Sequence, residues 1–108
     1  MSHKVLQEII ENSTSKSASF NTESVDMRGL NQGSFQVVLT ATGVSWTVVV
    51  QGSNDNSTFI SLATPTNVTD TTNIMFGFSD LECLYYRLAF TRTSGTLSSV
   101  IVTVGAKG

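Results

Sequence analysis

The chain has 108 residues, of which 40% are apolar and only 13% are charged, about half the usual charged share. Its formal net charge is −2, with six Lys and Arg residues that stand singly. This charge pattern predicts neither a nucleic-acid partner nor binding to an anionic membrane. The single cysteine, Cys83, excludes an internal disulfide and a thiolate zinc site within one chain.

Hydroxyl side chains supply most of the polar surface. Ser and Thr occur 15 times each, and the β-branched Thr favours strands. A surface that is rich in Thr and poor in charge also suits packing of protein against protein. No signal peptide is visible and Val5 to Ile10 is too short for a membrane span, so we expect a soluble protein made in a reducing cytoplasm.

The N-terminal segment, SHKVLQEIIE at residues 2–11, has a helical pattern. Four aliphatic residues cluster at i, i+4 and i+5 spacing: Val5, Leu6, Ile9 and Ile10. A Ser-rich run follows. We therefore predict an N-terminal helical or extended arm and linker over residues 1–19, outside a main domain at residues 20–108. The apolar arm residues need a partner surface, either on their own domain or on a neighbouring subunit.

From Phe20 onwards the apolar residues alternate with period two, which is typical of strands with one buried face. Turn residues separate the alternating segments, which we place weakly at 20–26 and clearly at 34–41, 44–51, 59–62, 74–78, 84–90 and 97–104. The pattern predicts an all-β fold, an antiparallel β-sandwich or jelly-roll-like barrel.

Two side chains have both a structural and a binding interpretation. Trp46 could stack on a sugar, but it shares its strand face with Val44 and Val48, which favours a core anchor. Arg87 lies on an outward strand face. It could contact an anion or a sugar, but a structural pair with an acid on the next strand is favoured.

The polar run GSNDNS, residues 52–57, separates two apolar segments. Asn54, Asp55 and Asn56 could hold a ligand, but a calcium loop needs a terminal carboxylate that does not follow here. The same residue types close Asx-turns and tolerate left-handed backbone. We interpret the run as a hairpin turn that aligns Trp46 and Val48 with Phe59.

No residue constellation predicts catalysis. His3 is the sole histidine, and Cys83 has no evident activating base. We therefore expect no enzymatic activity, no cofactor and no metal site.

Two longer stretches carry a family resemblance: WTVVVQGSNDNSTFISL at residues 46–62 and LECLYYRLAFTRTSGTLSSVIVTVGAKG at residues 81–108. Both resemble segments of discoidin-like, galactose-binding-type β-sandwiches. They also resemble segments of small virion proteins of tailed bacteriophages, which have a short arm, a low charge and a Ser/Thr-rich sandwich.

The phage resemblance implies a structural virion protein, of the capsid decoration or cement type. Such a protein would act as a homo-oligomer that binds the major capsid protein or another virion protein, with Val5, Leu6, Ile9 and Ile10 of the arm at the contact. The discoidin-like resemblance implies a carbohydrate-binding or host-adhesion module instead, with Asn54, Asp55 and Asn56 in the ligand loop.

Overall fold

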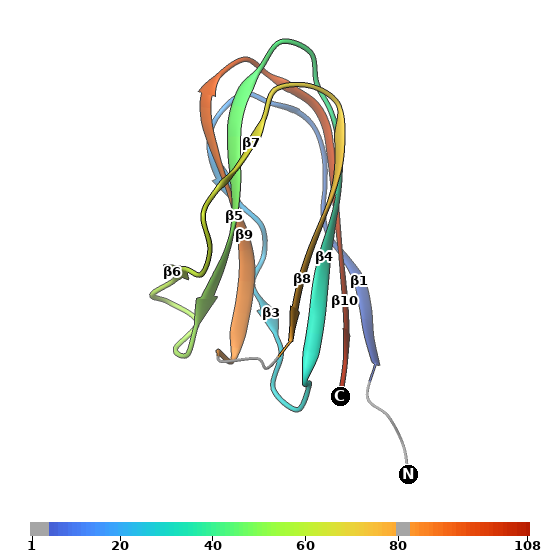
Figure 1. Ribbon diagram of the computed structural model, residues 1–108, viewed down its shortest axis with the longest axis vertical. Coiled ribbons are helices and arrows are strands. Elements are labelled where there is room, and N and C mark those ends of the chain that lie inside the picture. The colour runs from blue at the N-terminus through green and yellow to red at the C-terminus, as the bar shows by residue number, and fades with distance from the viewer. Residues whose placement is uncertain (1–4, 80–82) are drawn as a thin grey trace.

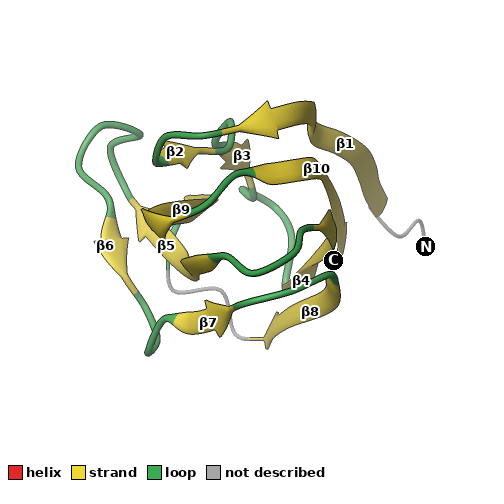
Figure 2. Cartoon of the chain, turned by 90° about the horizontal axis from the view of Figure 1, so that it is seen from above, coloured by secondary structure: helices red, strands yellow, loops and turns green. Residues whose placement is uncertain are grey.

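The computed structural model describes residues 5–79 and 83–108. Two sheets face each other in this part of the chain, and each strand pair is antiparallel (Figures 1 and 2). The first sheet contains, in spatial order, β1 (Val5–Lys16), β10 (Leu97–Lys107), β4 (Gln32–Thr40) and β8 (Thr72–Ser79). The start of β1 and the chain end after β10 lie at the same end of the molecule (Figure 1).

The second sheet is built around the long strands β9 (Tyr85–Ser94) and β5 (Ser45–Ser53). Short strands flank them: β2 (Phe20–Asn21), β3 (Val25–Asp26), β6 (Ile60–Ser61) and β7 (Thr66–Val68). The sandwich is elongated, 48 × 25 × 19 Å. The predicted fold class, an antiparallel β-sandwich, is confirmed. The described residues contain no helix that could cross a membrane.

The core lies between the inner faces of the two sheets. The predicted alternation holds on β4, where Phe35, Val37 and Leu39 are completely buried. Trp46 on β5 is 1% exposed, and its Nε1 donates a hydrogen bond to the carbonyl of Gly95 at 3.2 Å. This bond satisfies the one polar atom of the indole ring, so the prediction of a core anchor is confirmed.

Of the two conformations predicted for the N-terminal segment, helical or extended, the helix was wrong and the extended one is found. Residues 5–16 form strand β1, which pairs with β10 along its length. Ile9 and Ile10 point to opposite faces of the strand, so Ile9 is 60% exposed whereas Ile10 is 7% exposed. A bulge between Ile9 and Glu11 then shifts the register against β10. The segment predicted as an arm is therefore an edge strand of the first sheet. His3 and the other residues before Val5 lie outside the described part of the chain.

The hairpin predicted for residues 44–62 is present, but the predicted pairing of Trp46 and Val48 with Phe59 was wrong. β5 and β6 pair only at Gln51 with Ser61 and at Gly52 with Ile60. Trp46 pairs with Val68 on β7, not with Phe59. The reason is that the hairpin closes beside Gly52 and Ile60, so Phe59 lies next to the turn. The chain then continues along β5 in the same direction to β7, where Thr66 and Val68 pair with Val48 and Trp46.

The neighbouring pair Ile9 and Ile10 tests the β1 register. Ile10→Ala removes buried methylenes and should destabilise the fold by about 2–4 kcal/mol, whereas Ile9→Ala should change it by less than about 0.5 kcal/mol. Urea unfolding monitored by Trp46 fluorescence measures both. Equal effects of the two substitutions would contradict the strand register.

Candidate functional site

The outer face of the first sheet is the candidate site. The strand register aligns outward side chains in rows that cross β1, β10, β4 and β8. The upper row contains Ile9, Thr103, Gln36 and Met75, and the middle row contains Gln7, Gly105, Ser34 and Gly77. A lower row contains Val5, Lys107 and Gln32. We call the surface formed by these three rows the outer face.

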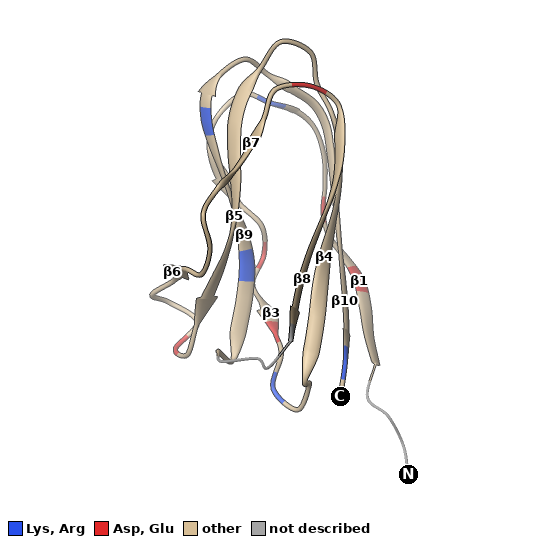
Figure 3. Ribbon diagram, viewed as in Figure 1, with Lys and Arg blue, Asp and Glu red and all other residues tan. Residues whose placement is uncertain are grey.

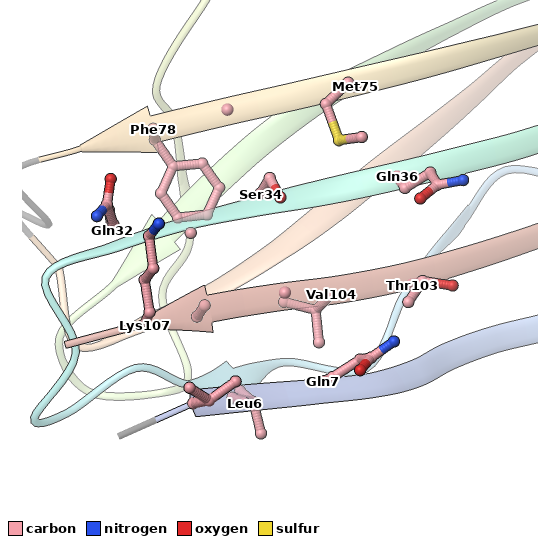
Figure 4. Close-up of a pocket in the computed structure, with 15 residues that line it drawn as sticks. Leu6, Gln7, Gln32, Ser34, Gln36, Met75, Phe78, Thr103, Val104 and Lys107 are labelled. Carbon is pink, nitrogen blue, oxygen red and sulfur yellow. The ribbon is translucent and has the colours of Figure 1, made fainter. Parts of the chain in front are cut away.

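A shallow groove of about 700 Å³ crosses this face (Figure 4). Its floor is low because the middle row has two glycines and a serine in place of larger side chains. A Cβ added to Gly77 would meet nothing within 4 Å, and one added to Gly105 would meet only the Ser34 hydroxyl at 3.9 Å. Among residues 5–79 and 83–108, the groove is therefore bounded by backbone and by the neighbouring rows.

The outer face is almost free of charge. Lys107, at its lower corner, is the only charged side chain in the three rows. β4 and β8 contain no Lys, Arg, Asp or Glu (Figure 3). Such a surface has no electrostatic attraction for a phosphate backbone or an acidic ligand.

The groove can donate and accept hydrogen bonds and can bury apolar atoms. Carboxamides come from two strands, through Gln7 on β1 and through Gln32 and Gln36 on β4. Met75, 61% exposed, and Val5, 72% exposed, contribute apolar surface. Neutral amides and exposed aliphatic groups match another protein surface, which offers the same two kinds of group.

The structure places two of the four predicted arm residues, Val5 and Ile9, on this outer face. Leu6 borders the groove, but its side chain packs against the core. Ile10 also points inward and belongs to the buried core. Their spacing was recognised in the sequence, but their position on a sheet was not.

The loop of Asn54, Asp55 and Asn56 lies at one end of the second sheet. Asp55 Oδ1 accepts hydrogen bonds from Thr58 N at 2.8 Å, Ser57 N at 2.9 Å and the Ser53 hydroxyl at 2.8 Å. These donors, the Thr58 N–H foremost, lower the pKa of Asp55 from its ordinary value of 3.8 to about 2.

The two asparagines in this loop have local roles. Asn54 Oδ1 accepts from Leu84 N at 3.2 Å, and Asn56 has a left-handed backbone with φ 57°. Asparagine is one of the few residues other than glycine that tolerate this backbone conformation. The geometry is that of an Asx-turn, as the residue types indicated.

The remaining candidates are structural contacts. Arg87 donates from Nε to Gln51 Oε1 at 2.9 Å and lies 3.9 Å above the ring of Phe59, so its partner across the strands is an amide where we predicted an acid. Cys83 is half-buried beside Gly52, where an added Cβ would lie 2.6 Å from the sulfur. Residues 5–79 and 83–108 contain no group of three His, Cys, Asp or Glu side chains placed to hold a metal ion.

Sequence reasoning missed the middle row. Gly77 was placed in the alternating segment 74–78 without a role of its own, and Gly105 only followed the segment 97–104. An isolated glycine inside a strand pattern is a known indication of close backbone approach. That signal could have marked each glycine, but only the register shows that both flank Ser34.

Comparison with solved structures shows that the same β-sandwich fold occurs in prophage-derived and viral particle proteins. It is similar to the PBSX exported protein XepA, with a TM-score of 0.70 and 17% identity over 94% of this chain and 36% of XepA. It is also similar to the SPBc2 prophage-derived protein YomS, with a TM-score of 0.68 and 10% identity over 100% of this chain and 96% of YomS.

A chain of the T13 IBDV viral particle matches with a TM-score of 0.58 and 10% identity, over 95% of this chain and 31% of that one. The chain thus spans about a third of XepA and of the viral chain, but nearly all of YomS. At these identities the likeness establishes the shared fold. No family model and no curated protein sequence matches the chain.

The turn around Asp55 should weaken in acid. Because its pKa is lower in the folded chain, the ionised carboxylate stabilises the fold above about pH 3.8, and this contribution is lost as the pH falls towards about 2. Asp55→Asn should remove that part of the acid dependence. Urea midpoints measured across this pH window compare the two proteins, and an unchanged acid profile in the variant would contradict the assignment.

Proposed function

We propose that this protein is a non-enzymatic structural component of a phage-type particle, and that it binds other particle proteins through the outer face. The observation that carries the proposal is the nearly uncharged groove across β1, β10, β4 and β8. The similarity to prophage-derived and viral β-sandwiches supports this class of function. The finer role that we propose is decoration and stabilisation of the capsid, with the major capsid protein as the partner.

The mechanism needs no chemistry. Val5, Ile9 and Met75 would lose contact with water when the face is covered, and burial of apolar area favours association. The carboxamides of the groove would exchange hydrogen bonds with water for hydrogen bonds with the partner. Binding to the assembled shell and not to its free subunits would stabilise the shell by mass action. The protein would be made in the host cytoplasm and would remain with the virion.

The carbohydrate-binding alternative has less support. It would need Asn54, Asp55 and Asn56 to turn their polar groups to a ligand, but the oxygens of Asn54 and Asp55 already accept hydrogen bonds within the chain. The groove offers no exposed aromatic ring for stacking on a sugar either, because its Phe78 stacks on Tyr86 at 4.9 Å between ring centroids.

Particle association tests the proposal. Particles from cells that carry the gene are purified on a density gradient, and the protein is quantified by mass spectrometry and located by immunogold labelling. The proposal expects a fixed copy number relative to the major capsid protein. Absence of the protein from washed, intact particles would reject it.

Filling the groove should weaken this association. Gly77→Thr and Gly105→Thr each place a strand-favouring side chain where an added Cβ has no close neighbour, so we expect folding stability to be kept or to rise by up to about 1 kcal/mol. We expect the copy number per particle to fall at least about tenfold, the effect of a loss of about 1.4 kcal/mol.

Ser61→Thr is the control, because it places the same Thr side chain at an exposed strand position of the second sheet. The control should leave the copy number unchanged. Normal incorporation of both glycine variants would show that the groove is not the contact surface.

A further inference from the structure

The two edges of the first sheet are protected to different degrees. The β1 edge has a bulge between Ile9 and Glu11 and a left-handed residue, Ser15, with φ 55°. Glu8 and Glu11 pair with Val104 and Val102, whose side chains point into the core, so the two acids stand on the inward side of an edge strand. Bulges and inward charges are features by which natural sheets prevent pairing with another chain.

The β8 edge has none of these features. Residues 72–79 contain no charge and no proline, and their register against β4 runs without a shift. Within residues 5–79 and 83–108, β8 is the last strand of its sheet, and no further strand pairs with its other side. Alternate backbone N–H and C=O groups of β8 therefore point outward, in position to pair with another strand.

The β8 edge also has apolar side chains that are partly or largely exposed to solvent. Ile74, Phe76 and Phe78 pack against the core but are only partly buried. Met75 is 61% exposed on the opposite side of the strand. An added strand would satisfy the free backbone groups and reduce the exposure of both sets of side chains. The edge is thus suited to an extended polypeptide that adds to the sheet.

We propose that the occupant is β8 of a second copy of this chain, paired antiparallel about a two-fold axis at Met75. The pairing would join the two first sheets into one continuous sheet, with four strands from each copy. Ile74 of each copy would face Phe76 of the other, and Asn73 of each would face Gly77 of the other. This inference deepens the proposed function, because it names one protein partner of the sandwich and rests on that protein-binding role.

Three features make β8 compatible with its own copy. The strand has no charge, so antiparallel self-pairing places no like charges together. The Ile74–Phe76 pairs combine β-branched and aromatic side chains, a favourable cross-strand combination. The Asn73 side chain meets bare backbone at Gly77, where an added Cβ has no neighbour within 4 Å. A two-fold contact also pairs the β8 edges of both copies with each other, so no β8 edge is left to bind a third copy and a fibre does not form through β8.

Sedimentation of the purified protein tests the pairing. We expect a concentration-dependent dimer, with stronger amide-exchange protection of β8 at high than at low concentration. Met75→Lys and Met75→Glu each place like charges at the axis, and each should raise the dimer dissociation constant at least about tenfold. Ile60→Lys, at a 65% exposed position of the second sheet, should leave it unchanged.

Mixing the two Met75 variants is the decisive measurement. The axis at Met75 places Lys opposite Glu in a mixed dimer, so an equimolar mixture should recover the wild-type dissociation constant. A wild-type chain that stays monomeric up to about 1 mM, or charge variants that dimerise normally, would overturn the inference. Failure of the mixture to recover dimers would overturn it too. None of these results depends on particles, so the proposed particle role is judged separately by its own copy-number measurement.

Discussion

The strict alternation of β10 is the constraint on which the first sheet depends. Val100, Val102 and Val104 are completely buried, and the strand is paired on both sides, with β1 and with β4. A slip of one residue in either pairing would move these valines to the outer face. The same alternation puts Thr103 and Gly105 outside, so the core and the groove are fixed by one strand. The candidate site is therefore a direct consequence of how the core is packed.

The sequence allowed the core to be predicted wherever alternation was regular. Phe35, Val37 and Leu39 show it without interruption, and all three are completely buried. The N-terminal segment failed for a physical reason. Val5 and Ile9 point outward, while Leu6 and Ile10 point inward. Each face of the strand therefore has two aliphatic residues that are four positions apart. An i, i+4 spacing of aliphatic residues is also the pattern of an amphipathic helix, and only pairing with β10 decides between the two.

The groove could not be predicted, because it is a property of register between strands that are distant in sequence. Gly77 and Gly105 are 28 positions apart, and Ser34 between them comes from a third strand. The Asx-turn at Asp55 could be predicted, because its donors lie within three residues and the residue types specify the turn. Local chemistry was therefore accessible from the sequence, whereas a surface assembled across four strands was not.

The two glycines of the groove favour a functional explanation over a structural one. Glycine inside a strand costs about 0.5–1 kcal/mol relative to alanine, because it loses more backbone freedom on folding and has no side chain to pack. Elsewhere the fold needs its glycines: Gly43 and Gly95 have positive φ, and Gly52 touches the Cys83 sulfur. Neither Gly77 nor Gly105 has a positive φ, and neither is crowded. No contact or backbone angle within residues 5–79 and 83–108 requires glycine at these positions, and the proposed contact of a partner with the groove supplies a reason for them.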